Sequence, residues 1–170
     1  DNAGKKYKGF NVYIRNGATL RANKRTLGFW SNVIVEDGGT YDWDGTAWTF
    51  QTFANLTLYG GTNFSLAAKA STADKGYELF VVTNQLWFTG TKTFVLDQDS
   101  DFKNQRQPLG LVPTSQIKVD DITEDDGIDA AINLQIIDAN GSAAVPSGFV
   151  KTGEGTLLLS GNKGGYVSQG

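Results

Sequence analysis

Carboxylates at alternate positions are the first candidates for chemistry in this sequence. Asp97, Asp99 and Asp101 are spaced as at the start of a calcium-binding loop, where every second residue supplies an oxygen ligand. The pattern is incomplete, because Phe102 stands where such a loop has glycine and Pro108 stands where it has its last glutamate. An EF-hand is therefore excluded. Two interpretations stay open: a solvated acidic loop, or a calcium site built on the three aspartates.

A second acidic stretch, residues 120–129, has the sequence DDITEDDGID and also carries enough carboxylate oxygen for one calcium ion. The acidic residues are also the remaining candidates for an enzyme, because glycoside hydrolysis needs only two carboxylates, about 5 or 9 Å apart. The sequence singles out no such pair. We therefore expect a protein that is not an enzyme and has no catalytic residues, with a carbohydrate-active enzyme as the less favoured alternative.

Residues 41–48, with the sequence YDWDGTAW, concentrate aromatic rings and carboxylates. We expect Trp43, Trp48, Asp42 and Asp44 to be the residues that contact a sugar or protein ligand, if this segment forms a binding platform. Alternation along a strand places Tyr41 and Trp43 on one face and the two aspartates on the other. The alternative is that Trp43 packs in the core and the segment only makes a turn.

Composition excludes several classes of function. The chain has 170 residues and no His or Cys, which removes Ser-His-Asp and Cys-His catalysis, His or Cys zinc sites and disulfides. Its net charge of −3, with scattered basic residues, gives no footprint for nucleic acid. No run approaches the roughly 20 apolar residues of a membrane helix, and the length fits one domain with a hydrophobic core.

Short repeated strands are the elements that would position these side chains. Residues 11–14, 32–35 and 55–58 share one template, a polar residue followed by apolar residues at the next position and two beyond, and a glycine follows each. The template recurs at 85–88, 133–136 and 156–159, and more weakly at 116–119. Units of about 21 residues cannot bury their apolar faces alone, so they must stack. We predict an all-β, right-handed parallel β-helix with an irregular excursion around residues 97–148.

This arrangement predicts which side chains stack on one another. Asn11, Asn32 and Asn55 are expected at a corner with left-handed backbone, as a ladder of hydrogen-bonded amides, and the following glycines are expected in turns with positive φ. Leu20, Tyr41, Phe64 and Phe94 are expected on the next face. The two predicted core columns are Val12, Val33, Leu56, Leu86, Leu134 and Leu157, and Ile14, Val35, Leu58, Phe88, Ile136 and Leu159.

The predicted organisation is a single domain over residues 1–170. Residues 1–10 are a candidate cap, residues 11–96 form regular coils, residues 97–148 form coils with acidic loop insertions, and residues 149–170 form a last repeat coil.

The last segment resembles a known family. The sequence VKTGEGTLLLSGN of residues 150–162, with Tyr166 after it, resembles the autotransporter-associated β-strand repeat. The matching residues are Lys151, Gly153, Gly155, Thr156, Leu157, Leu159 and Gly161. In the family the asparagine usually falls one or two positions later than Asn162, and a Gly-Gly-Thr strand follows the tyrosine, whereas this chain continues with VSQG. The match covers about a tenth of the sequence.

The resemblance implies a segment of the passenger of a bacterial type V secretion protein, displayed on the outside of the outer membrane or secreted. Because no membrane barrel follows, we expect a piece of a longer protein. We expect it to act as an adhesin or a self-association module, with host glycans, extracellular matrix proteins or neighbouring bacterial cells as partners. Homo-association through the ends or faces of the stack, no nucleic acid, and no cofactor apart from calcium complete this expectation. The alternative is a structural stalk or folding-assist segment without a ligand.

Overall fold

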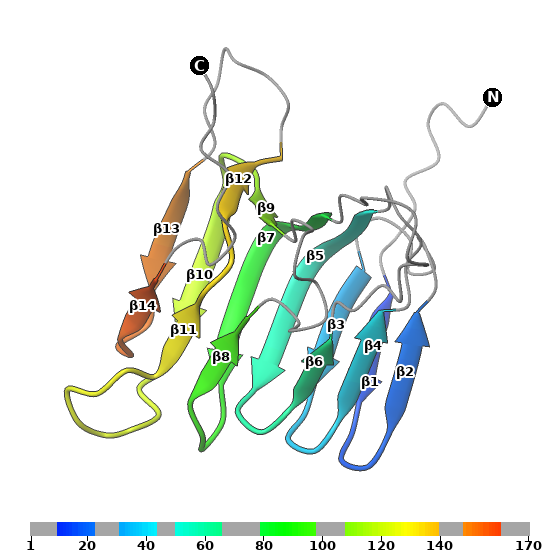
Figure 1. The fold of residues 1–170 in the computed structure, drawn as a ribbon, viewed down its shortest axis with the longest axis horizontal. Helices are drawn as coiled ribbons and strands as arrows, with labels where there is room; N and C mark the ends of the chain where they lie inside the picture. Colours follow the sequence, from blue (N-terminus) through cyan, green and yellow to red (C-terminus); the bar gives the residue numbers. More distant parts are fainter. Residues whose placement is uncertain are drawn as a thin grey trace, which may run out of the picture.

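The computed structural model describes residues 10–22, 31–43, 50–65, 79–97, 108–139 and 148–160, and these residues are all-β, without a helix (Figure 1). The all-β prediction is therefore confirmed. The strands are β1 (Asn11–Ile14), β2 (Thr19–Ala22), β3 (Ser31–Val35), β4 (Thr40–Trp43), β5 (Phe50–Tyr59), β6 (Asn63–Ser65), β7 (Leu79–Thr89), β8 (Phe94–Leu96), β9 (Leu109–Leu111), β10 (Ser115–Val119), β11 (Ala130–Ile132), β12 (Ile136–Asp138), β13 (Phe149–Thr152) and β14 (Leu157–Leu159).

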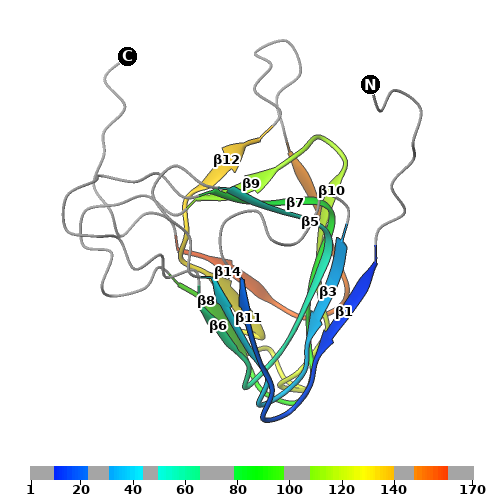
Figure 2. The same ribbon diagram turned by 90° about the vertical axis from the view of Figure 1, so that its right-hand side faces the viewer.

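The strands pair in parallel in three sheets. The main sheet has the order β1-β3-β5-β7-β10-β13, with β9 paired to β7 and β12 paired to β9. The two small sheets have the orders β2-β4-β6 and β8-β11-β14. Figure 2 looks along the stack, and shows the main sheet on one side, the small sheets on a second, and β9 and β12 with the first parts of β5 and β7 on a third.

A repeated unit therefore consists of one main-sheet strand, a turn and one small-sheet strand. The described residues contain six such strand–turn–strand units: β1–β2, β3–β4, β5–β6, β7–β8, β10–β11 and β13–β14. Strand β3 shows why these segments form strands. Its β-branched Val33 and Val35 are fully buried, while the alternate residues Asn32 and Ile34 face outward and are half-buried.

Both predicted core columns are confirmed for their first four members. The strand register pairs these residues in order and buries their side chains, except that Val12 on the outermost strand is only partly buried. The confirmed members are Val12, Val33, Leu56 and Leu86, and Ile14, Val35, Leu58 and Phe88.

The last members of the first column were predicted wrongly. Leu86 pairs with Ile117, and Ile117 pairs with Lys151, so neither Leu134 nor Leu157 belongs there. Leu157 instead pairs with Ala130 in a small sheet, and Leu134 is buried between β11 and β12. A period-two pattern indicates a strand, but it does not say which strand lies next to it.

The second column needs the same correction. Phe88 pairs with Val119 of β10, whereas Ile136 pairs with Leu109 and Leu159 with Ile132. On the next face, Leu20, Tyr41 and Phe64 pair in order as predicted. Phe94 pairs with Ala130 in the other small sheet.

The turns between the paired strands stack as well. Gly17, Gly38 and Gly61 have φ values of 76°, 75° and 89°, which confirms the predicted positive φ. The N–H of Gly17 donates to the carbonyl of Gly38 at 3.0 Å, and the N–H of Gly38 donates to the carbonyl of Gly61 at 3.3 Å. Successive turns are thus joined by backbone hydrogen bonds, like the strands that they follow.

Candidate functional site

The outer face of the main sheet carries polar and aromatic side chains that point away from the core. Because pairing is in register, its side chains form three rows that run across the strands. The amide row is Asn11, Asn32, Asn55, Gln85 and Gln116. The middle row is Tyr13, Ile34, Thr57, Trp87 and Lys118. The turn-side row is Arg15, Glu36, Tyr59, Thr89 and Asp120.

The predicted asparagine ladder lies in the amide row. The Asn32 amide nitrogen donates to Asn11 Oδ1 at 2.8 Å, and the Asn55 amide nitrogen donates to Asn32 Oδ1 at 2.6 Å. Asn84, which the repeat did not indicate, adds a third bond to Asn55 Oδ1 at 2.6 Å. An extra residue in β7 at a register shift brings Asn84 to this place.

The expected left-handed corner for these asparagines is wrong. Asn11, Asn32 and Asn55 lie within strands β1, β3 and β5, and Glu124 is the single non-glycine residue with positive φ in the described part of the chain. In-register parallel pairing already places like side chains above one another, so a ladder needs no corner.

A cluster around Trp87 occupies the C-terminal half of this face. The Trp87 indole nitrogen donates to Asp120 Oδ2 at 2.9 Å, and the Thr89 hydroxyl donates to the same oxygen at 2.6 Å. Lys118 lies 3.9 Å from the centre of the Trp87 ring and 3.3 Å from Asp120 Oδ1. The ammonium group is therefore held by a ring face and a carboxylate at once. We refer to Trp87, Thr89, Lys118 and Asp120 as the Trp87 cluster.

The Asp120 carboxylate is held in its charged form. Desolvation raises its pKa, but the hydrogen bonds from Thr89, Trp87 and Lys118 outweigh this, and the pKa lies below its ordinary value. An ionised acceptor that already receives three donors is poorly suited to giving or taking a proton near neutral pH. The contacts of the Trp87 cluster therefore hold its side chains in place on the surface, and they do not suit Asp120 to proton transfer.

The acidic stretch 120–129 is the turn between β10 and β11, and one of its carboxylates is buried. Asp129 is 1% exposed. Its Oδ1 accepts the backbone N–H groups of Ile122 at 2.7 Å and Thr123 at 2.8 Å, and its Oδ2 accepts the N–H of Thr156 at 2.7 Å. The Thr123 hydroxyl adds a bond at 3.0 Å. This carboxylate binds backbone groups of its own turn and of the next unit.

Burial raises the pKa of Asp129, yet the backbone hydrogen bonds from Thr156, Thr123 and Ile122 bring the pKa below its ordinary value. Two further carboxylates accept backbone N–H groups within this turn. Asp121 accepts the N–H of Glu124 at 2.9 Å and Asp125 accepts that of Gly127 at 2.6 Å.

The described residues contain no group of three or more side chains that could hold a metal ion. Of the predicted calcium ligands, Asp97 is exposed and accepts the side-chain amide of Asn133 at 3.1 Å. Asp99 and Asp101 lie outside the described residues. A calcium site on these three aspartates therefore stays a prediction.

The predicted platform is described only in part. Tyr41 is buried and Asp42 points outward, where its Oδ2 accepts Arg21 Nε at 2.7 Å. Burial raises the pKa of the Tyr41 hydroxyl well above its ordinary value, so this residue is neutral. Trp43 ends β4 with its backbone paired to Ala22, while its side chain, and Asp44 and Trp48 entirely, lie outside what the structure describes.

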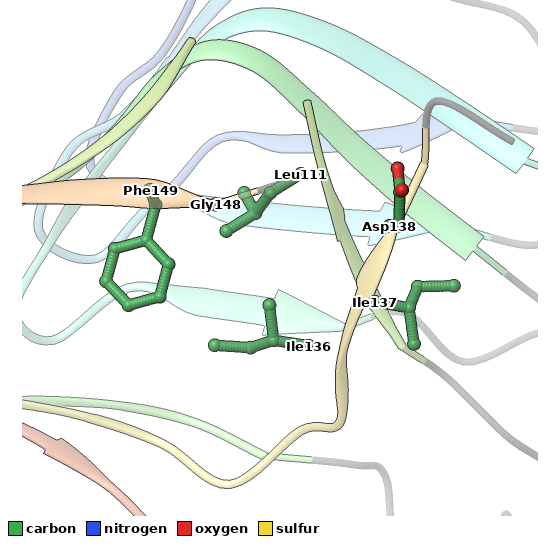
Figure 3. Close-up of a pocket in the computed structure, with 6 residues that line it drawn as sticks. All are labelled: Leu111, Ile136, Ile137, Asp138, Gly148 and Phe149. Carbon is green, nitrogen blue, oxygen red and sulfur yellow. The ribbon is translucent and has the colours of Figure 1, made fainter. Parts of the chain in front are cut away.

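A half-open pocket of about 260 Å³ lies where β9, β12 and β13 meet. Figure 3 shows Phe149, Leu111 and Ile136 grouped on one side of it, with Ile137 and Asp138 on the other. The side chains that line it are apolar apart from the carboxylate of Asp138. Such a lining offers contact area and one anchoring charge, but no second group for acid–base chemistry.

Sequence reasoning missed the Trp87 cluster and the buried role of Asp129. The signal for the cluster was present, because Trp87, Thr89, Lys118 and Asp120 occupy alternate positions that face outward from their strands. It could be used only after β7 and β10 were known to be neighbours.

The comparisons with protein-family models, with curated proteins and with solved structures found no significant match. In the described part of the chain, no helix is long and apolar enough to cross a membrane.

Proposed function

We propose that the chain is a right-handed parallel β-helix that is displayed outside a bacterial cell as a passenger segment of a type V autotransporter, where it acts as an adhesin. The observation that carries the binding role is the outer face of the main sheet. It places aromatic side chains such as Tyr13, Tyr59 and Trp87 beside rows of amides and carboxylates. Ring faces and planar hydrogen-bonding groups together are what sugar and protein surfaces need for recognition.

The geometry of the segment that resembles the autotransporter repeat supports the proposed family. Gly153 has φ 78°, and a Cβ on it would lie 2.1 Å from the carbonyl oxygen of Val119. A Cβ on Gly155 would lie 2.2 Å from the carbonyl oxygen of Asp120. Both glycines of the motif stand where one strand–turn–strand unit touches the next, so a stacked structure needs them there.

The carboxylates support a binding protein over an enzyme. Asp120 and Asp129 each receive several hydrogen bonds that favour the charged form. A general acid for glycoside hydrolysis needs the opposite, a carboxyl that keeps its proton near neutral pH. We therefore propose that the protein binds carbohydrate or matrix protein without transforming it, and that no cofactor is required.

The experiment is a binding screen of the purified chain on immobilised glycans and matrix proteins, with and without calcium, that also measures release of reducing sugar. We expect saturable binding without release, and calcium dependence would show that the ion takes part in binding. Tyr59→Ser should weaken binding, whereas Val95→Ser, at a 55% exposed position on a small sheet, should not. Sugar release would favour the enzyme. A folded chain that neither binds nor releases sugar would favour the structural stalk.

A further inference from the structure

The side-chain hydrogen bonds along the amide row reverse their direction at one place in β7. On one side of it, Asn84 donates to Asn55 Oδ1 at 2.6 Å, and Asn55 donates to Asn32 Oδ1 at 2.6 Å, so the donors point toward β1. On the other side, Gln85 donates the opposite way, to Gln116 Oε1 at 3.4 Å. Asn84 and Gln85 thus use their N–H groups in opposite directions, and their carbonyl oxygens are left at the junction.

These two oxygens are available to a ligand. No donor among the described residues bonds to Asn84 Oδ1 or to Gln85 Oε1, whereas Oδ1 of the neighbouring Asn55 already accepts a hydrogen bond. Each carboxamide oxygen has two lone pairs. Asn84 is exposed and Gln85 is half-buried, so solvent reaches both side chains. The junction therefore offers two acceptors to a molecule that carries donors.

A β-bulge brings the two acceptors to one place. The register pairs Phe53 with Val82 and then Asn55 with Gln85, so β7 has one residue more than β5 over this stretch. Asn84 bonds to the side chain of the same Asn55 that Gln85 pairs with. Bulges are common next to active sites, where they redirect a side chain. Here the extra residue doubles the number of carboxamides at one position of the row.

An aromatic ring lies beside the junction. Trp87 follows Gln85 by two residues on β7, so both side chains point outward from the sheet. Trp87 is half-buried, which leaves part of its indole exposed. A sugar ring has apolar C–H faces as well as hydroxyl donors, so it can contact the indole while its hydroxyls donate to the two oxygens.

We propose that Asn84, Gln85 and Trp87 form a subsite for one neutral sugar ring, whose vicinal hydroxyls donate to Asn84 Oδ1 and Gln85 Oε1. This inference deepens the proposed adhesin role and rests on it, because it names the class of ligand and the part of the outer face that binds it.

The charges of the outer face favour a neutral ligand over an ion. Lys118 lies 3.3 Å from Asp120, and Arg15 lies 3.9 Å from Glu36, so the charged residues of the three rows occur as opposite-charge pairs. Two carbonyl oxygens repel an anionic group. Calcium takes about six to eight oxygen ligands, which two carboxamides do not supply. Sugar hydroxyls need neither a charge nor a full coordination shell.

Saturation-transfer NMR of the purified chain with methyl glycosides of glucose, galactose and mannose tests the subsite. We expect at least one of these neutral glycosides to bind, with an affinity that changes less than about twofold when the salt is raised tenfold. The matching glycoside of the uronic acid, which carries a carboxylate, should bind more weakly. A deoxy form that lacks one of the two vicinal hydroxyls should bind about tenfold more weakly.

Variants of the row locate the binding. Asn84→Leu and Gln85→Leu each remove one acceptor at similar side-chain size, and each should weaken binding of that glycoside about tenfold. Gln85→Glu keeps the acceptor oxygens and should retain binding. Gln116→Leu is the matched control, because it removes a carboxamide of the same row whose oxygen already accepts a hydrogen bond, and it should change the affinity less than about twofold.

Three outcomes would overturn the subsite: glycoside binding that is unchanged in both leucine variants, binding that requires the carboxylate of the uronic acid, and no binding of any of the three neutral glycosides by the folded chain. A variant that circular dichroism shows to be unfolded is replaced by Asn84→Ala or Gln85→Ala. If the chain still binds immobilised glycans or matrix proteins in the screen, only the subsite fails. If it binds nothing there, the adhesin role fails with it.

Discussion

Oδ2 of Asp129 accepts the backbone N–H of Thr156 at 2.7 Å, and this bond helps to tie the acidic turn after β10 to the residue that precedes β14. Together with the bonds to Ile122 and Thr123, it makes one carboxylate the partner of three backbone groups. The acidic stretch 120–129, the second calcium candidate in the sequence, therefore contains a carboxylate that binds backbone groups of the protein.

Replacing Asp129 should destabilise the chain. Asp129→Ala leaves three backbone N–H groups without their acceptor, and we expect a loss of roughly 3 kcal/mol in the free energy of unfolding. Asp129→Asn keeps one acceptor oxygen but directs an amide N–H toward a donor, so a loss of roughly 2 kcal/mol is expected. The measurement is urea unfolding followed by circular dichroism. Asp126→Asn, in the same turn but exposed, is the control, and an equal loss there would contradict the role of Asp129.

The stability of the chain should fall in acid for the same reason. The pKa of Asp129 is lower in the folded chain than in the unfolded chain, so protonation favours unfolding. Its stabilisation is complete above about pH 4 and is lost as the pH falls through the folded-state pKa. Urea unfolding at a series of pH values from 7 to 2 measures this. The loss should be smaller in Asp129→Asn, and identical acid profiles for the two chains would rule out this carboxylate as the cause.

Three glycine substitutions separate backbone strain from crowding in the stacked turns. In Gly17→Ala the added Cβ has no atom within 4 Å, but the residue keeps φ 76°, so the substitution should cost about 1 kcal/mol of stability. Gly60→Ala places a Cβ 1.7 Å from the carbonyl oxygen of Lys92 in the next unit, and should cost roughly 3 kcal/mol because the backbone must move. Gly148→Ala has neither problem and should be neutral. Thermal unfolding of the three variants should give this order, and equal losses would contradict the close stacking at Gly60.

The regular part of the fold could be predicted because its units are short and nearly equal in length. Asn11, Asn32 and Asn55 recur at separations of 21 and 23 residues, so a repeat aligns them without ambiguity. Beyond β5 the separations grow to 30 residues or more, as between Asn55 and Gln85, or Gln85 and Gln116. More segments then match the template than there are strands in the order β1-β3-β5-β7-β10-β13. The alternation within one segment does not show which of them pair.

The candidate sites could be predicted less well. Which aspartate of residues 120–129 is buried depends on the N–H of Thr156, which is 27 residues away from Asp129. The Trp87 cluster likewise depends on β10 lying next to β7, and the segment 116–119 of β10 is the weakest match to the strand template. Long-range pairing decides both sites, and composition or spacing within one segment does not reveal it.

The register of β7 against β10 brings the Trp87 cluster together and orders the outer face of the main sheet. The chain has no cysteine, so engineered pairs can be read directly. Gln85 and Gln116 are register partners, and Gln85→Cys/Gln116→Cys should form a disulfide under mild oxidation. Gln85→Cys/Asn133→Cys, the pair that the repeat alone would align, should stay reduced. Cross-linking of the second pair in place of the first would contradict the register of β7 against β10.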